Sequence, residues 1–255
     1  MLTRPTLFLL GLALSGALLA EQPEPPALHY LTESFPPYNY SDSNVLRGIA
    51  VDLLVSATQG SAQPVTRSQI RLLPWPRAYR MALQEPGSVL FSTTRSAERE
   101  TLFKWAGPIC ATRVVLLALK SRQIRIDDPQ QLRQYRIGVV PEDIGEVASL
   151  RVGVPRQQLQ RSSSADALAR QLHAGRIDLW AYDEHVARWF LRNVRLDPED
   201  FEVVHVLQEG ELWYAFHPQT DDQHVRQLQE ALDRVRRLPG KIGPSLYDDI
   251  LLNYL

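Results

Sequence analysis

Arg99 ends the polar stretch Ser92–Arg99 and is the first candidate for ligand chemistry. A guanidinium presents a planar fork of N–H donors, so it meets a carboxylate with two charge-assisted hydrogen bonds and keeps its charge at physiological pH. An arginine beside a glutamate such as Glu98, in a polar loop, is also commonly just solvated. The sequence therefore indicates an anion-binding role for Arg99, with solvation as the alternative.

Asp183 is the second charged residue whose position favours ligand binding. It follows the apolar residues 177–182, which predict a buried strand, and ligands bind beyond the carboxyl ends of parallel strands. Aspartate is also a good N-cap, and residues 184–191 have the spacing of a helix. The sequence leaves both roles open.

Motifs for covalent or metal chemistry do not occur in the sequence. It contains no glycine-rich phosphate loop, no nucleophile elbow and no His-Glu-x-x-His. The six histidines lack paired ligand spacing, and the one cysteine, Cys110, excludes an internal disulfide. Asp183-Glu184-His185 is an acid–base triplet, but adjacent residues at a helix start point in different directions. We therefore expect no catalytic residue, no metal and no cofactor.

Apolar runs typical of strands alternate with amphipathic segments along the chain. The predicted strands are residues 27–32, 70–73, 89–91, 114–119, 137–140, 177–182, 201–207 and 212–216. The predicted helices are residues 46–58, a segment opened by Pro76, one capped by Asp128, one begun by a capping box at 163–166, residues 184–191, and residues 225–235 with a stop at Gly240. This alternation predicts an α/β fold with mostly parallel sheets, and the length suits two doubly wound lobes of roughly 110 residues each.

Composition and charge exclude several classes of protein. The 255 residues are 44% hydrophobic and 22% charged, with a net charge of -1, so no broad basic field is present to bind nucleic acid. Residues 7–20 form an apolar run of roughly 21 Å as a helix, too short for a bilayer core of about 30 Å. With Arg4 before it and Ala20 at its end, this run predicts a signal peptide over residues 1–20, cleaved near Ala20. An uncut membrane anchor is the alternative.

Several short signatures follow one another in order over residues 27–255. They are Phe35-Pro36-Pro37-Tyr38, Gly48-x-x-x-Asp52-Leu53, Leu73-Pro74-Trp75-Pro76-Arg77, Ser92-Thr93-Thr94-x-x-x-Glu98-Arg99, Phe103-x-Trp105-Ala106-Gly107-Pro108, Gly138-Val139-Val140 and Gly175-Arg176-Ile177-Asp178. In this order and spacing the chain resembles the periplasmic solute-binding proteins of family 3, the polar amino-acid binders of ABC importers.

The resemblance implies the type II fold of periplasmic binding proteins, with two doubly wound lobes, a hinge and a cleft between them. Lobe one would consist of residues 27–112 and 214–255, and lobe two of residues 113–213. The ligand-binding residues carried over by the resemblance are Arg99, Thr94 and Ser92 for the α-carboxylate, Asp183 for the α-ammonium, and Phe35, Tyr38 and Trp75 as the aromatic walls of the pocket.

Two positions depart from the family pattern. The family presents a Ser or Thr at the start of the lobe-two helix, but here the stretch is Pro141-Glu142-Asp143-Ile144 and Ile144 falls on that position. The two acids would fill the positive end of the helix or repel a bound carboxylate. Arg77 is also unusual for this pocket, and we expect it to bind an additional acid of the ligand or to pair with Glu142.

The resemblance implies a periplasmic monomer that binds a small molecule, with an amino acid or related small acid as the leading ligand class. It would deliver this ligand to an inner-membrane ABC permease and would not bind nucleic acid. Two alternatives share the fold: a periplasmic enzyme similar to cyclohexadienyl or arogenate dehydratases, in which Glu142 or Glu184 would be the acid, and the ligand-sensing subunit of a membrane receptor.

Overall fold

The computed structural model describes residues 28–255, so the predicted signal peptide lies outside the described residues. Its strands are β1 (His29–Thr32), β2 (Tyr40–Asp42), β3 (Val45–Arg47), β4 (Arg71–Leu72), β5 (Ser88–Thr94), β6 (Lys104–Leu119), β7 (Ile137–Val139), β8 (Leu159–Arg161), β9 (Leu179–Asp183) and β10 (Phe201–Phe216). Its α-helices are α1 (Ile49–Thr58), α2 (Trp75–Gln84), α3 (Ile144–Arg151), α4 (Ala165–His173), α5 (Glu184–Asn193), α6 (Asp222–Arg237) and α7 (Leu246–Leu252).

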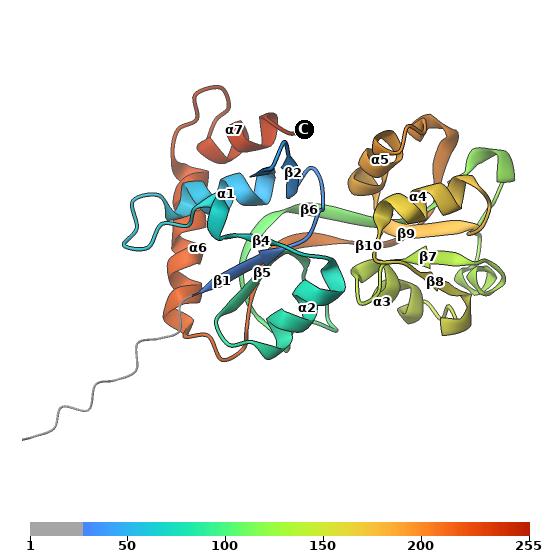
Figure 1. The fold of residues 1–255 in the computed structure, drawn as a ribbon, viewed down its shortest axis with the longest axis horizontal. Coiled ribbons are helices and arrows are strands. Elements are labelled where there is room, and N and C mark those ends of the chain that lie inside the picture. Colours follow the sequence, from blue (N-terminus) through green and yellow to red (C-terminus); the bar gives the residue numbers. More distant parts are fainter. Residues whose placement is uncertain (1–27) are drawn as a thin grey trace, which may run out of the picture.

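One eight-stranded sheet runs through the whole molecule in the order β4-β1-β5-β10-β6-β9-β7-β8. Lobe one contains β4, β1 and β5 with helices α1, α2, α6 and α7, and lobe two contains β9, β7 and β8 with α3, α4 and α5 (Figure 1). β1 is parallel to β4 and β5, and β7 is parallel to β8 and β9. Each lobe is therefore an α/β unit, as the alternating pattern predicted.

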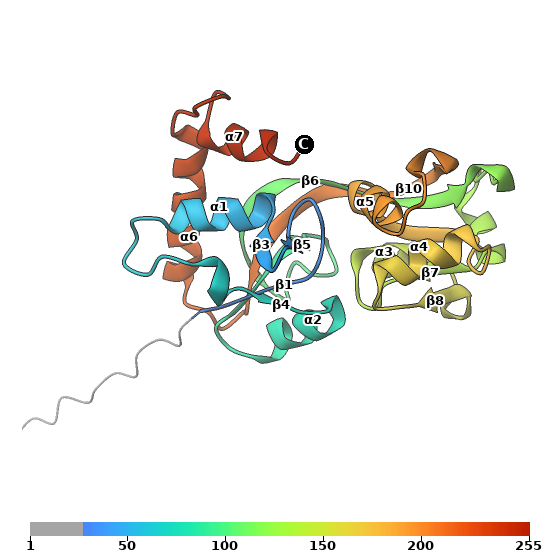
Figure 2. The same cartoon turned by 45° about the horizontal axis from the view of Figure 1, so that its top comes forward.

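The long strands β6 and β10 belong to both lobes and join them, which the turned view also shows (Figure 2). They pair with each other antiparallel from Phe201 opposite Leu119 to Phe216 opposite Lys104. β10 meets β5 from Leu212 onward, and β6 meets β9 from Val114 onward. Between these points, residues 111–113 and 209–211 have only each other as strand partners, so this short ribbon is the thinnest part of the sheet.

The predicted lobe boundaries at 112/113 and 213/214 fall inside β6 and β10, in or close to this ribbon. Three register shifts interrupt the pairing of β6 with β10, and such irregularities bend and twist a strand pair. A bend here moves one lobe against the other. The boundaries stay a prediction that a measurement of hinge motion has to test.

Helices cover the sheet through the apolar faces that the sequence shows. α6 buries Leu228, Leu232 and Val235, whose spacing keeps them on one face. The helix ends at Arg237, with Leu238 as its C-cap, before the predicted stop at Gly240. Asp221 caps its first turn by accepting a hydrogen bond from the Gln223 amide.

Several local predictions need correction. Residues 201–207 and 212–216 are parts of one strand, β10, and not two strands. Asp128 caps residues Pro129–Gln134 with a full capping box, but this segment is a 3-10 helix. The cap of α4 is Ser164, which accepts from the Ala167 amide, and not the predicted box at 163–166.

Candidate functional site

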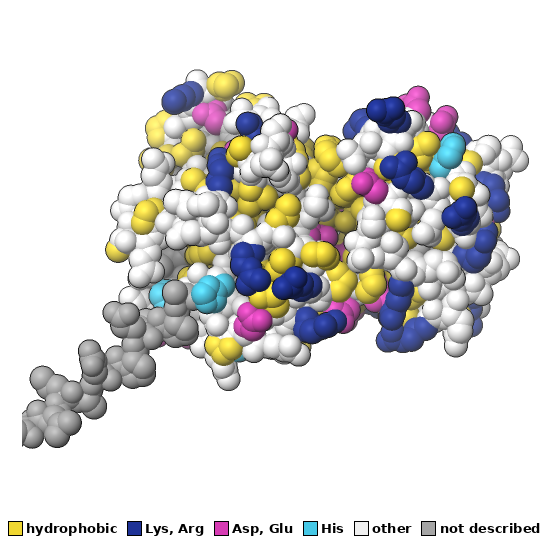
Figure 3. Space-filling model, in the orientation of Figure 1, with side chains coloured by type: hydrophobic (Ala, Val, Ile, Leu, Met, Phe, Trp, Pro, Cys, Tyr) yellow, Lys and Arg dark blue, Asp and Glu magenta, His cyan; other side chains and the backbone are white. Residues whose placement is uncertain are grey.

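The two lobes touch along a seam between the carboxyl ends of their parallel strands, called the interlobe seam below. Arg99 of lobe one donates to the Glu142 carbonyl of lobe two over 2.9 Å, and the rings of Phe35 and Tyr182 lie 5.6 Å apart. At the rim an ion pair of 3.4 Å joins Glu98 to Arg151. The space-filling view shows the lobes in contact across a narrow groove (Figure 3). The structure is thus in a closed arrangement.

Arg99 lies buried in this seam, with only 1% of its surface exposed. Its guanidinium donates to the carbonyls of Thr94, over 3.2 Å, and Glu142. It also lies 5.2 Å from the ring centres of Trp75 and Tyr79, a distance at which a cation is attracted to an aromatic face. Its Nε has no hydrogen-bond partner in the structure. Arg99 is therefore not the solvated surface arginine of the alternative interpretation.

Thr94 and Ser92 lie at the end of β5, and both are buried. Thr94 meets Arg99 through its carbonyl and not through its hydroxyl. The Ser92 hydroxyl donates to the side-chain oxygen of Asn39, and the Asn39 amide donates to the Glu33 carbonyl over 2.6 Å. In this state the Ser92 hydroxyl therefore fixes the loop that follows β1.

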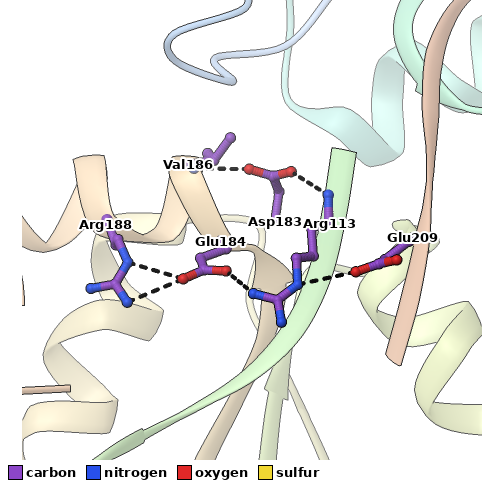
Figure 4. Close-up of polar contacts among 6 residues, drawn as sticks. All are labelled: Arg113, Asp183, Glu184, Val186, Arg188 and Glu209. Atoms are coloured by element: carbon purple, nitrogen blue, oxygen red, sulfur yellow. Dashed lines mark hydrogen bonds and ion pairs between the residues drawn. The ribbon is translucent and has the colours of Figure 1, made fainter. Parts of the chain in front are cut away.

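Asp183 is the N-cap of α5 and is 1% exposed. Its carboxylate accepts from the Val186 amide over 3.0 Å and from the Arg113 amide over 3.4 Å (Figure 4). It also accepts from the Thr112 hydroxyl over 2.7 Å. The capping role that the sequence left open is therefore real. Burial is the main cause that raises the pKa of Asp183, and these hydrogen bonds act against it.

Arg113 and Glu184 form an ion-pair network next to Asp183 (Figure 4). The Arg113 guanidinium is 2.5 Å from Glu184 and 3.4 Å from Glu209, and Glu184 also pairs with Arg188 at 3.1 Å. These arginines lower the pKa of Glu184. Because Arg113 and Glu209 lie in the ribbon of β6 and β10, the network ties α5 to the connection between the lobes. A carboxylate held ionised in this way is poorly suited to donate a proton, as the dehydratase alternative would require of Glu184.

Aromatic rings enclose the seam from lobe one. Phe35, Tyr38 and Trp75 are at most 3% exposed. The rings of Phe35 and Tyr38 stack at 5.5 Å, and burial together with the charge of Asp183 raises the pKa of Tyr38. Gly48 makes this arrangement possible: it has φ of 124°, and a Cβ there would lie 2.3 Å from the Tyr38 carbonyl oxygen.

Arg77 lies in the first turn of α2. It is exposed, whereas Trp75, Ala78 and Ala82 of this helix are buried. Among residues 28–255 no ion pair joins Arg77 to Glu142, the partner that we expected as one possibility. A contact of Arg77 with an additional acid of the ligand stays a prediction.

Sequence reasoning missed the acid Glu33 and assigned no binding role to Asp143. Glu33 follows β1 in lobe one and is 8% exposed, while Asp143 precedes α3 in lobe two and is 4% exposed. Burial and the Asp143 charge raise the pKa of Glu33 well above its usual range, and burial raises the pKa of Asp143 to about 6, with the Arg99 guanidinium opposing both shifts. The signal was available, because Glu33 follows a buried strand just as Asp183 ends one.

The loop before α3 shows how lobe two presents its backbone to Arg99. Glu142 has a φ of 64°, and its amide donates over 2.8 Å to the carboxylate of Glu146, which Arg161 also binds at 2.5 Å. This holds the Glu142 carbonyl toward Arg99. Ile144, which replaces the family's hydroxyl residue, is buried in the core of lobe two. The helix start therefore offers an acceptor to the seam.

Other candidate features lie outside the seam or do not occur in the described part of the chain. A cavity of about 840 Å³ lies in lobe one beside α6, lined among others by Tyr30, Val65 and Leu228, and none of the buried unpartnered polar atoms faces it. Within residues 28–255 no group of three or more metal-binding side chains is placed to hold an ion, and no helix is long and apolar enough to cross a membrane.

Comparison with known proteins identifies the fold. No family model and no curated protein matches the chain. An ancestral arginine-binding protein bound to arginine matches with a TM-score of 0.72 and 17% identity, over 90% of this chain and 99% of that chain. The arginine-, lysine-, histidine-binding protein ArtJ from the thermophilic bacterium Geobacillus stearothermophilus matches with a TM-score of 0.71 and 16% identity. The match covers 90% of this chain and 95% of that chain. The fold is that of the type II periplasmic binding proteins.

A signalling protein has the same periplasmic-binding-protein fold. A histidine kinase sensor domain with similarity to periplasmic binding proteins matches with a TM-score of 0.74 and 18% identity, over 91% of this chain and 96% of that chain. At these identities the likeness concerns the fold alone. The two-lobed architecture is thus shown, while ligand and partner depend on the residues of the seam.

Proposed function

We propose that this protein binds an amino acid in the interlobe seam in the periplasm and delivers it to an inner-membrane ABC permease. The observation that carries the proposal is the buried Arg99, which faces carboxylates of both lobes in a setting walled by aromatic rings. Structural relatives that bind amino acids support the same ligand class. The related proteins reported above are binding proteins and a sensor domain, which favours binding over catalysis.

In this proposal Arg99 binds the α-carboxylate and Asp183 binds the α-ammonium. Arg99 has an unpartnered Nε and uses two carbonyls as acceptors, which are weaker partners than a carboxylate. A ligand carboxylate that replaces the Glu142 carbonyl would therefore gain strength and would still connect the lobes. Phe35 and Tyr38 would cover the ligand, with Thr94, Ser92 and Trp75 supporting Arg99 and the loop.

The balance of buried charge favours a cationic amino acid. Glu33, Asp143 and Asp183 are buried at the seam against the single guanidinium of Arg99, so the ionised site carries more negative than positive charge. An amino acid with a cationic side chain adds a net positive charge and would compensate this excess, whereas an acidic one would increase it. Arginine, lysine and histidine, the ligands in the name of the ArtJ structure, belong to this class.

A thermal-shift screen of the purified protein against the common amino acids tests the proposal. A ligand at a hundred times its dissociation constant should add about 2.7 kcal/mol to the free energy of unfolding. We expect the largest shift with arginine or lysine, and a much smaller shift with glutamate. The absence of a shift with every amino acid would contradict the proposal.

Ligand sensing for a membrane receptor is the second candidate, favoured by the match to the histidine kinase sensor domain. It requires the same binding step and differs in the partner that recognises the closed state. Transport of radiolabelled arginine into cells that lack this protein separates the two: importer function predicts lost uptake, and sensing predicts unchanged uptake with altered gene expression.

A further inference from the structure

Glu33 and Asp143 are buried carboxyls that lack the partners such groups normally have. Asp143 Oδ2 is buried and has no hydrogen-bond partner in the structure, and Glu33 is only 8% exposed, with burial as the largest cause that raises its pKa. An ionised carboxylate buried without donors costs several kcal/mol, so such a group takes up a proton or acquires a cation. If both carboxylates are ionised, the closed seam therefore lacks a proton or a cation that compensates their charge.

The charged groups that face this pair come from both lobes. Arg99 faces both carboxyls and stabilises their ionised forms, but its hydrogen bonds go to the carbonyls of Thr94 and Glu142. Asp183 acts against ionisation of Asp143 from the end of β9, while the amides of Ile144 and Gly145 favour it. Burial, together with the charges of Glu33, Asp143 and Asp183, raises the pKa of Tyr182, so its hydroxyl remains a neutral group. Arg99 thus faces both acids of the pair, and Asp183 adds a further negative charge next to Asp143.

The two carboxyls lie on opposite lobes, so their ionisation acts on closure. Glu33 moves with lobe one and Asp143 with lobe two. When both are ionised, they repel each other in a setting from which water is largely excluded, and separation of the lobes relieves the repulsion. When one of them holds a proton, the repulsion is absent and the contact between Arg99 and Glu142 can form.

We propose that the empty seam closes with one proton held by the Glu33 and Asp143 pair, and that the cationic side chain of the ligand replaces this proton. The inference rests on the proposed function. On binding, the O–H bond of the carboxylic acid breaks, the proton passes to a buffer base in solution, and an N–H of the ligand donates to the carboxylate. Binding is then coupled to proton release, and acid returns the ligand to solution.

Calorimetric titration of the full chain with arginine tests the coupling. Titrations in phosphate and in imidazole, which have different ionisation enthalpies, should give release of about half a proton per arginine at pH 6 and of about one proton at pH 5. For a group that must lose a proton with a pKa near 6, affinity should fall about tenfold from pH 7 to pH 5. Binding without proton release, with equal affinity at both values of pH, would overturn the inference and leave the proposed function standing.

Variants separate the pair from other acids. Glu33→Gln with Asp143→Asn should weaken arginine binding at pH 7 and remove its dependence on pH. The matched control is Glu85→Gln, which neutralises an exposed side chain at the end of α2, outside the seam, and should keep the tenfold change. A double variant that retains the full pH dependence would assign the proton to other groups and contradict the inference.

A measurement without ligand keeps the inference testable if no amino acid binds. Carbon-13 NMR of the labelled empty protein follows each carboxyl as pH changes. A carboxyl that titrates near pH 6 or above in the wild type and disappears in the double variant supports the proton-holding pair. Titration of all carboxyls below pH 5 would overturn it, whether or not the proposed function holds.

Discussion

Asp183→Asn separates the helix-capping role of this residue from its proposed ligand role. Asparagine caps a helix as well as aspartate does, so its carbonyl can keep the 3.0 Å hydrogen bond from the Val186 amide. The Thr112 hydroxyl, which donates over 2.7 Å, can rotate and accept from the new amide. The variant also removes a buried charge whose pKa is raised by burial. We expect the free energy of unfolding to change by less than about 1 kcal/mol.

Ligand binding should respond much more strongly to Asp183→Asn. Truncating one partner of a buried charge pair costs about 2–5 kcal/mol, which corresponds to about 1.5 to 3.5 decades of affinity. Arginine should lose this much in a calorimetric titration at pH 7.5. Its deaminated analogue, 5-guanidinopentanoate, has no α-ammonium to bind and should change by less than about threefold.

The control for capping is Asp183→Ala, which should lower the free energy of unfolding by about 0.5–2 kcal/mol. Equal losses for arginine and 5-guanidinopentanoate in Asp183→Asn would remove Asp183 from the ligand site. A loss of stability in Asp183→Asn as large as that in Asp183→Ala would refute the reasoning about the cap.

Three further predictions concern the anchor, the loop and the hinge. Arg99→Ala should weaken arginine binding by about 2–5 kcal/mol in calorimetry. Arg99→Lys should recover only part of the loss, because an ammonium lacks the planar fork of a guanidinium. Unchanged affinity in Arg99→Ala would overturn the amino-acid assignment. Gly48→Ala should destabilise the protein by at least about 2 kcal/mol in urea unfolding, since its Cβ would lie 2.3 Å from a backbone carbonyl oxygen. The control Gly60→Ala, at a φ of 81° with open space around it, should cost about 1 kcal/mol. Equal losses in the two variants would contradict the steric argument. Solution scattering at pH 7.5 should show a smaller radius of gyration on addition of arginine, and an unchanged radius at saturation would argue for rigid lobes.

The alternation of apolar runs with amphipathic segments was sufficient to predict the α/β fold, but it did not show that β10 is continuous. Its middle residues, Gln208-Glu209-Gly210-Glu211, include no apolar side chain; Glu209 and Glu211 are exposed, and Gln208 and Gly210 are half-buried. A segment without apolar side chains has no apolar alternation that predicts a strand. Only the pairing with β6, far away in the sequence, makes these residues a strand.

Some residues of the candidate site can be predicted from local sequence motifs, and others depend on contacts between distant segments. Arg99 and Asp183 stand in local motifs, and the structure buries both. Glu33 and Asp143 are buried where the lobes meet. The end of a buried strand marks Glu33 in the sequence, but no local pattern places it near Asp143, which lies far away along the chain. The exposure of Arg77 could be predicted, because the helical spacing of Trp75, Ala78 and Ala82 already turns Arg77 away from the buried face of α2.

The position of β10 between β5 and β6 has a consequence for how the chain folds. β10 comes late in the sequence, yet it lies in the centre of the sheet between β5 and β6. During synthesis, the backbone of the fully buried strand β5 therefore has no partner on this side until residues 201–216 have been added. Pairings such as Trp105 with Ala215 close a very long loop, so the native sheet forms slowly and only after lobe two is present. A chain truncated before β10 would expose unpaired strand edges, which promote aggregation. We therefore expect the two lobes to unfold together in a single cooperative transition, which calorimetry can check, although each of them has the layers of a separate domain.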